Sequence, residues 1–395
     1  MDPIYNPYSP GAGCPPPELA GRDKVISQAS TAMARIRIGN SAKSLLLVGL
    51  RGVGKTVLLE KIRSDAESAG IFTIKMEAPE DRSLPALIAP QLRLALLRLS
   101  RVEKAKDFAQ KSLRALAGFA KALKYKYNDI EVGFDFDPEP GLADNGDLEG
   151  DLGALLVQAG HTAKNANTAL VIFIDELQYV KQEQFAALIT ALHKCTQENL
   201  PLALIGAGLP QLRALAGKAK SYAERLFDYP MIDKLNPVDA TLAIVKPASD
   251  QGVQYTPEAV DAIMQQTQGY PYFLQEWGKH SWDIATHSPI TAEDVTNASC
   301  QAIAALDESF FRVRFDRLTP TEKKYIRAMA ELGSGPHRSG DIAEELGRTS
   351  ASLGPIRSSL ITKGMIWSPT YGDTTFTVPL FDEFMRRVMP SGSTE

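Results

Sequence analysis

The chain has 395 residues, of which 44% are hydrophobic and 23% are charged, and its formal net charge is −4. This length predicts two or three domains, and the composition excludes a disordered protein. The negative net charge excludes a globally basic nucleic-acid binder, so any DNA contact must come from a local patch.

The first 20 residues are rich in proline and glycine, which predicts an extended arm laid over the core that follows. They contain neither the basic region nor the apolar region of a signal peptide. No run approaches the roughly 20 apolar residues of a membrane-spanning helix. Three widely spaced cysteines favour a reducing compartment without structural zinc or a disulfide framework. We therefore expect a cytoplasmic protein with no membrane contact.

A phosphate-binding loop follows the apolar run Leu45–Val48, which is typical of a buried strand. The loop matches G-x-x-x-x-G-K-[ST] at every position, and its predicted nucleotide-binding residues are Gly49, Leu50, Arg51, Gly52, Val53, Gly54, Lys55, Thr56 and Val57. Glycines allow the backbone N–H groups to curl around phosphate oxygens, and the following helix adds its positive end. Lys55 is suited to the β- and γ-phosphates, and Thr56 is suited to Mg²⁺. The motif predicts ATP and Mg²⁺ as cofactors.

Two segments then separate this loop from the next motif. Residues 91–122 show helical periodicity with basic side chains on most sides. Residues 129–151 contain nine acidic residues and no basic one, and 130–136 alternate like a strand. This acidic insertion is either a docking surface for a basic protein partner, or a DNA mimic, or a solvent-exposed loop, and charge blocks favour the last.

A second buried strand is predicted at residues 169–174, and Asp175 and Glu176 follow it. We expect the two motifs at the tips of neighbouring parallel strands, where Asp175 holds Mg²⁺ and Glu176 orients and deprotonates water. Such an acidic pair can also be an ordinary helix N-terminus. Together with the loop, it predicts an ATPase with Glu176 and Lys55 as catalytic residues.

These two motifs resemble those of AAA+ ATPases, and more specifically those of the origin-recognition-complex-like and STAND-like branches. The resemblance implies an α/β P-loop NTPase core (a parallel sheet flanked by helices), an α-helical lid and a C-terminal winged helix-turn-helix. It implies that Gly21 and Arg22 flank the adenine. The expected parts are an arm at 1–20, an ATPase core at 21–235, a lid with a linker helix at 236–315, a winged helix at 316–390 and a flexible tail at 391–395.

Other family positions match less well. Arg225 resembles an arginine finger, which implies a homo-oligomer with ATP at the subunit junctions; the alternative is a surface arginine paired with Glu224 or Asp228. The strand that ends at residues 206–208 lacks the polar sensor-1 residue, and Gln211 is the remaining candidate. The lid has no sensor-2 arginine. Its 269–271 triplet resembles that of STAND proteins, and sensing through Pro271, Lys279 or His280 stays open.

The C-terminal segment predicts three helices and a hairpin. A capping box of Thr319 and Glu322 starts the first helix. The third is rich in hydroxyls and has no acid, which is suited to double-stranded DNA, and its candidate contacts are Arg348, Ser350, Ser352, Arg357 and Lys363. Against this, residues 318–388 carry nine basic and eight acidic residues, and Pro355 is expected to interrupt the third helix.

The leading hypothesis is therefore an Mg²⁺-dependent ATP-binding and hydrolysing switch that couples nucleotide state to DNA engagement. The alternative is a STAND-like signalling ATPase whose winged helix is a protein-interaction clamp. Glu176 disfavours a third class, a nucleotide-binding scaffold without turnover.

Overall fold

The computed structural model describes residues 1–390 except 12, 79–81, 125, 128 and 131–136. The chain forms two compact units. The sheet unit comprises residues 22–48 and 55–231, and the helical unit comprises residues 1–21, 49–54 and 232 onward. The predicted strand at 130–136 lies outside the described residues except for residue 130, and the predicted tail at 391–395 lies wholly outside them. The predicted domain boundaries stay predictions. No helix in the described part of the chain is long and apolar enough to cross a bilayer.

A parallel sheet forms the centre of the sheet unit, with strand order β2-β3-β4-β1-β5. The strands are β1 Ser44–Val48, β2 Phe72–Glu77, β3 Leu170–Asp175, β4 Leu202–Gly208 and β5 Phe227–Asp228. Every residue of β1 and β3 is buried, which confirms both predicted strands and the α/β class. The expectation of neighbouring strand tips is wrong, because β4 pairs with both β1 and β3 and lies between them.

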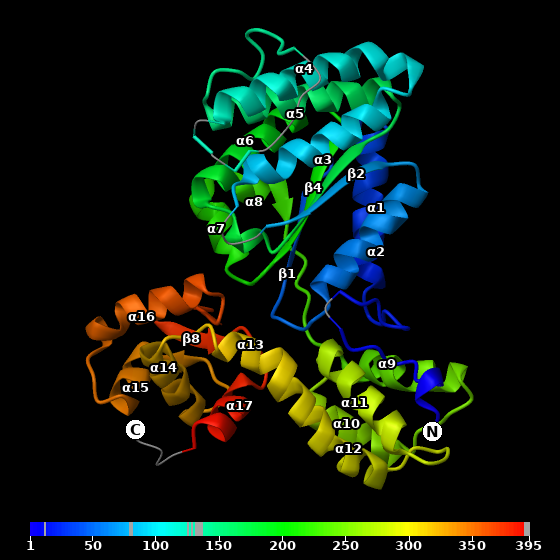
Figure 1. Cartoon of the computed structure of the whole chain (residues 1–395), viewed down its shortest axis with the longest axis vertical. Coiled ribbons are helices and arrows are strands. Elements are labelled where there is room, and N and C mark those ends of the chain that lie inside the picture. The colour runs from blue at the N-terminus through cyan, green and yellow to red at the C-terminus, as the bar shows by residue number, and fades with distance from the viewer. Residues whose placement is uncertain (12, 79–81, 125, 128, 131–136, 391–395) are drawn as a thin grey trace. The chain divides into compact units, whose positions relative to one another are not determined.

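Helices cover both faces of this sheet. Figure 1 shows α1 and α2 on one face and α3 to α6 on the other. Their bounds are α1 Asp23–Arg37, α2 Lys55–Ser68, α3 Leu84–Leu99, α4 Lys106–Leu123, α5 Leu148–Asn165, α6 Gln182–Gln197, α7 Leu212–Ala219 and α8 Ala223–Leu226. The helical stretch predicted at 91–122 is two helices, because a 3₁₀ turn at Glu103–Ala105 separates α3 from α4.

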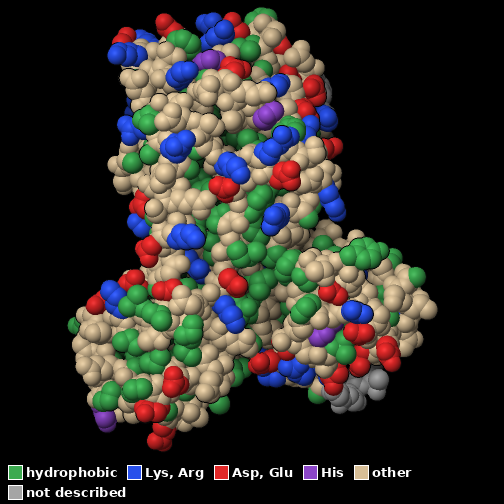
Figure 2. All heavy atoms as spheres, turned by 180° about the vertical axis from the view of Figure 1, so that it is seen from behind, with side chains coloured by type: hydrophobic (Ala, Val, Ile, Leu, Met, Phe, Trp, Pro, Cys, Tyr) green, Lys and Arg blue, Asp and Glu red, His purple; other side chains and the backbone are tan. Residues whose placement is uncertain are grey.

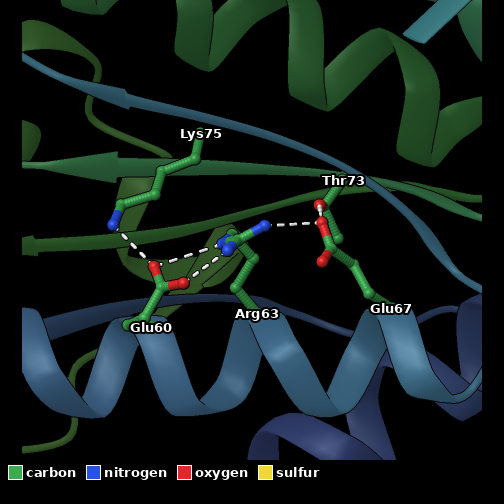
Figure 3. Close-up of polar contacts among 5 residues, drawn as sticks. All are labelled: Glu60, Arg63, Glu67, Thr73 and Lys75. Atoms are coloured by element: carbon green, nitrogen blue, oxygen red, sulfur yellow. Dashed lines mark hydrogen bonds and ion pairs between the residues drawn. The ribbon is translucent and has the colours of Figure 1, made fainter. Parts of the chain in front are cut away.

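A polar network holds α2 against β2 (Figure 3). Glu60 accepts from Arg63 and from Lys75, whose Nζ lies 2.6 Å from the carboxylate, and Arg63 donates to Glu67 at 2.6 Å. The pKa of Glu60 is lowered to about 2, first by its bond with Arg63. All these side chains are partly exposed, so the network contributes little to stability and mainly orients α2, the helix that begins at Lys55.

After its N-terminal segment, the helical unit continues with a bundle in which Asn236 and Thr256 are helix N-caps. Its helices are α9 Pro237–Asp250, α10 Pro257–Thr267, α11 Pro271–Ile284, α12 Ala292–Ala305 and α13 Arg312–Phe315. A π-helical segment, Leu306–Phe311, joins α12 to α13, so these helices form one continuous element whose winding changes. Phe273 and Trp277 are buried in this bundle, as expected of core aromatics.

The N-terminal arm packs on this bundle. The Tyr8 hydroxyl donates to the Ile244 carbonyl, and Asn6 donates to the Lys279 carbonyl at 3.0 Å. Trp282 donates to the Asp2 carbonyl at 3.0 Å. The apolar body of Tyr8 is 4% exposed, and the bundle supplies both its packing and its hydrogen-bond acceptor.

The C-terminal module, residues 316–390, contains the predicted three helices and hairpin. Its elements are α14 Pro320–Glu331, β6 His337–Arg338, α15 Ser339–Glu345, α16 Ser350–Thr362, β7 Ile366–Trp367, β8 Asp373–Phe376 and α17 Phe381–Val388. The capping box of Thr319 and Glu322 is confirmed. Strand β6 adds to the hairpin to give the sheet order β6-β8-β7. The expected break at Pro355 is wrong, since α16 runs through this residue.

Candidate active site

Lys55 and Thr56 begin α2, and Asp175 ends β3. The Thr56 hydroxyl is hydrogen-bonded to the Asp175 carboxylate, which also accepts from the Glu176 N–H at 2.8 Å. Lys55 and Asp175 are only 7% and 3% exposed, and they interact electrostatically. Thr56 and Asp175, which were predicted to share one cation, therefore lie together, and Lys55 is close to them. This holds although β1 and β3 are not neighbouring strands.

Burial raises the pKa of the Asp175 carboxyl above its ordinary value. The bonds from Thr56 and from the Glu176 N–H oppose this rise, as does the charge of Lys55. A buried carboxylate of this kind gains from a cation, because the cation offsets the cost of keeping the charged form out of water.

The loop from Gly49 to Gly54 depends on glycine at defined places. A Cβ on Gly49 would lie 2.0 Å from the Ile232 carbonyl oxygen, so no side chain fits there. Gly54 has φ +87°, and a Cβ there would meet nothing within 4 Å. The backbone next to Lys55 is thus left-handed with open space beside it, which suits a loop that curls around a phosphate.

The donor set fits a magnesium ion. A hydroxyl and a carboxylate are hard oxygen ligands of the kind that Mg²⁺ binds. Among the described residues no group of three or more His, Cys, Asp or Glu side chains could hold a metal. A cation beside Thr56 and Asp175 would therefore draw its other ligands from phosphate oxygens and water, as Mg²⁺ commonly does with nucleotides.

Glu176 follows β3 in a left-handed conformation, with φ +51° and ψ +36°. A non-glycine residue seldom adopts these angles, and such strain gathers at functional sites. The turn aims the Glu176 carboxylate toward Gln178, whose side-chain amide donates to it. The same Gln178 accepts a hydrogen bond from the Leu209 N–H at 3.0 Å. Local sequence does not single out Gln178, because its contact with the end of β4 joins residues some thirty positions apart in the chain.

The end of β4 carries no polar side chain, as the sequence indicated. Gly206, Ala207 and Gly208 are all buried. The sensor candidate Gln211 lies just beyond the strand, and its buried Oε1 has no hydrogen-bond partner among the described residues. Its role stays a prediction.

The predicted adenine residues lie at the start of α1, and the predicted finger residue lies within α8. Gly21 has φ +68°, and Arg22 is the buried N-cap residue of α1. Arg225 is exposed on α8 and forms no ion pair within the described residues, so the pairing with Glu224 or Asp228 is not observed. Asp228 instead pairs with Lys43 at 3.2 Å. All three functional roles stay predictions.

The lid candidates are engaged within α11. Pro271 is at the first helical position, Lys279 pairs with Asp283 at 3.1 Å, and His280 lies 3.6 Å from Glu276. None of these contacts identifies a nucleotide sensor, so that role also stays open.

The phosphate-binding loop is also bonded within the helical unit. The Arg51 N–H donates to the Thr377 carbonyl at 3.0 Å, and the Tyr272 N–H donates to the Gly52 carbonyl at 3.1 Å. Phe310, from the π-helical segment, stacks on Tyr272 with ring centroids 4.8 Å apart. A lid helix and the C-terminal module therefore both contact this loop.

The DNA-binding candidates divide into two groups. Arg348 and Ser350 are exposed at the start of α16, and the Ser352 hydroxyl donates to the Thr349 carbonyl. Arg357 donates to Thr374 Oγ1 at 2.8 Å, to Ser368 Oγ at 2.7 Å and to the Asp373 carbonyl.

Lys363 likewise donates to Glu322 at 2.6 Å. The last two basic side chains, Arg357 and Lys363, are thus engaged inside the module.

Several side chains of the acidic insertion form internal contacts. Asp129 accepts from Ser83 at 2.7 Å, Glu149 pairs with Lys220 at 2.8 Å, and Asp151 is fully buried. Asp151 accepts from the Asn145 and Gly146 N–H groups. These contacts favour a structural role over docking of a basic protein, which stays a prediction.

Two domain models match parts of this chain. Residues 18–205 match the AAA ATPase domain model, and residues 308–385 match a domain of unknown function. An uncharacterized HTH-type transcriptional regulator of Methanocaldococcus jannaschii is 23% identical over 347 residues, which are 85% of this chain and 80% of that protein.

Solved structures are similar in fold. A Walker-type ATPase of Pyrococcus abyssi has a TM-score of 0.58 at 13% identity, covering 93% of this chain and 96% of that one. The Aeropyrum pernix ORC1 protein in complex with DNA has a TM-score of 0.48 at 15% identity, covering 94% of each chain. The second score is too low to support an argument.

Proposed function

We propose that this chain, whose residues 18–205 match the AAA ATPase domain model, is an Mg²⁺-dependent ATPase whose nucleotide state controls DNA binding by its C-terminal module. The proposal assigns the phosphates of ATP to the loop amides and Lys55, and the cation to Thr56 and Asp175. The bound cation would neutralise charge on the phosphate oxygens.

Glu176 is the base in this proposal. Its carboxylate accepts a proton as the oxygen of water bonds to the γ-phosphorus and the bond from that phosphorus to the leaving oxygen breaks. Lys55 binds the phosphate oxygens on which negative charge accumulates. The closeness of the two carboxylates supports this role, because burial and the charge of Glu176 both raise the pKa of the Asp175 carboxyl at the end of β3.

One observation carries the coupling to the C-terminal module. Arg51 and Gly52, adjacent residues of the phosphate-binding loop, are bonded to Thr377 and Tyr272 respectively. Phe310 stacks on Tyr272, and Phe311 stacks on Phe384 of the module with centroids 5.2 Å apart. A change in the loop backbone on ATP binding would alter these bonds, so the module has a direct route to the nucleotide state.

DNA is the proposed ligand of the module for two reasons. The three helices and three-stranded sheet have the element order of a winged helix-turn-helix, and the relative from M. jannaschii is described as an HTH-type transcriptional regulator. Arg348 and Ser350 are exposed at the start of α16. On the face shown in Figure 2, basic and acidic side chains are intermixed, so we expect a small number of phosphate contacts.

A second candidate function is supported by the same loop contacts. If the module serves as an internal clamp, its bond to Arg51 holds the ATPase in one state until a protein partner binds. The internal engagement of Arg357 and Lys363 favours this candidate, because it leaves fewer basic groups for DNA.

Mobility shifts of DNA duplexes over a salt series, with ATP, with ADP and without nucleotide, separate the two candidates. The DNA-binding proposal expects affinity that weakens steeply with salt and differs several-fold between ATP and ADP. The Lys55→Ala variant should lose the nucleotide dependence, whereas Lys61→Ala, an exposed lysine of the same helix, should retain it. Absence of DNA binding even at about 50 mM salt overturns the proposal and leaves the clamp.

A further inference from the structure

Gln178 joins the proposed base to the end of β4. Its side-chain amide donates to the Glu176 carboxylate, and its Oε1 accepts from the Leu209 N–H at 3.0 Å. All three residues belong to the sheet unit, and Leu209 directly follows β4.

The orientation of the Gln178 amide follows from its two partners. A main-chain N–H can only donate, so the Gln178 oxygen must face Leu209. An ionised carboxylate can only accept, so the amide nitrogen must face Glu176. The usual ambiguity between the oxygen and nitrogen of a glutamine is therefore absent, and both partners hold the side chain in one orientation.

The end of β4 is shaped around this side chain. A Cβ on Gly208 would lie 2.7 Å from Gln178 Oε1, and a Cβ on Gly206 would lie 2.9 Å from Leu177 Cδ2. The absence of a polar side chain at this strand end thus has a physical reason. The strand leaves room for the Gln178 amide, which brings a polar group to the place where the sequence has none.

We propose that Gln178 is a positioning residue for ATP hydrolysis, which sets the direction of the Glu176 carboxylate relative to the end of β4. This inference rests on the proposed role of Glu176 as the base. The hydrogen bond from Gln178 restricts the orientations that the Glu176 carboxylate can adopt. A general base must be within hydrogen-bond reach of the attacking water, and a displacement of about 1 Å can cost about 100-fold in rate.

The test compares kcat for phosphate release with the equilibrium Kd for Mg-ATP. Gln178→Ala should lower kcat by about 10-fold to 100-fold and change the Kd by less than about threefold, because Gln178 acts on the base and not on the phosphates. Gln197→Ala, an exposed glutamine at the end of α6, is the matched control and should leave both quantities unchanged.

Two further variants separate positioning from simple support of the fold. Gln178→Glu keeps the acceptor for the Leu209 N–H but places a second carboxylate against Glu176, so kcat should be as low as in Gln178→Ala or lower. A purely structural role predicts near-normal kcat for Gln178→Glu. Gly208→Ala displaces the Gln178 side chain without touching Glu176 and should lower kcat in the same direction.

The outcomes distinguish this inference from the proposed function. If Glu176→Gln abolishes turnover while Gln178→Ala and Gln178→Glu keep kcat within about twofold of the unsubstituted protein, the role of Gln178 is wrong and the base is right. If Glu176→Gln keeps normal turnover, both are wrong. Retained Mg-ATP binding by each variant shows that it has folded.

Discussion

The end of β3 and helix α16 were both singled out by their charged side chains, but the tertiary structure uses those side chains differently. At β3, Asp175 is bonded to Thr56, the residue with which it was predicted to share a cation. On α16, Arg357 reaches across to β8, and Lys363, just after the helix, reaches Glu322 of α14. The groups predicted to bind a ligand at the end of β3 therefore lie together. The basic groups of α16 instead form hydrogen bonds within the C-terminal module.

The difference has a simple physical origin. An aspartate is short, so its carboxylate lies where the strand ends and the backbone alone decides its position. Arginine and lysine have long flexible side chains with several donors, so they can form hydrogen bonds with any acceptor that folding brings within reach. A motif of short side chains at strand ends is therefore better evidence for a site than a run of long basic ones.

The largest expected effect is on ATP hydrolysis and tests the residues at the end of β3. Glu176→Gln should reduce phosphate release by about 1000-fold while Mg-ATP still binds, because an amide cannot accept the proton of water at neutral pH. Lys55→Ala should instead weaken Mg-ATP binding itself. Steady-state phosphate release and equilibrium binding of labelled ATP measure the two effects. Glu183→Gln, an exposed glutamate on α6, is the matched control.

An effect of intermediate size is expected from the hydrogen bonds around the Glu322 carboxylate, and it concerns stability at low pH. Burial raises the pKa of this carboxyl, but Lys363, the Thr319 N–H and the Ser359 hydroxyl outweigh burial and lower the pKa to about 2 from an ordinary 4.5. The unfolded chain therefore holds the proton more tightly, and the stability that Glu322 contributes is present above about pH 4.5 and lost as the pH falls toward 2.

Between pH 7 and pH 3 the loss should be about 2 kcal/mol, because pH 3 is still above the pKa of about 2 in the folded protein. Urea unfolding at pH 7 and pH 3 measures it, and Glu322→Gln should remove that part of the acid sensitivity. A variant as acid-sensitive as the unsubstituted protein would show that Glu322 is not the responsible group.

The smallest effect concerns DNA and sharpens the comparison directly. Arg348→Ala removes an exposed cation, so it should lower the slope of log affinity against log salt by about 1 without changing stability. Arg357→Ala should leave that slope unchanged and destabilise the module by about 1 to 2 kcal/mol, because it removes three internal hydrogen bonds. Mobility shifts and urea unfolding measure the two quantities. The reverse pattern would return Arg357 to the DNA-binding set.

Local sequence was sufficient for much of the fold. The buried strands β1 and β3, the caps at Asn236, Thr256 and Thr319, and the helix order of the C-terminal module follow from apolar runs and short capping motifs. Each of these depends on residues within a few positions of one another, so the interactions that decide them are visible in one window of sequence.

Long-range contacts could not be predicted in this way. The sequence does not show that β4 separates β1 from β3, that the N-terminal arm packs on the lid helices, or that β6 completes the hairpin. These facts depend on pairings between segments far apart in the chain, and many such pairings are compatible with the same local pattern.

The sequence by itself determined the glycine-rich loop, Lys55, Thr56 and the two acids at the end of β3, since spacing and residue type are enough to specify that chemistry. Only the tertiary structure decided what holds these groups in place: Gln178 between Glu176 and Leu209, and the bonds of Arg51 and Gly52 to Thr377 and Tyr272. The physical reason is that a reactive group is recognised by what it is, whereas its supports are any donors and acceptors that folding brings within about 3 Å.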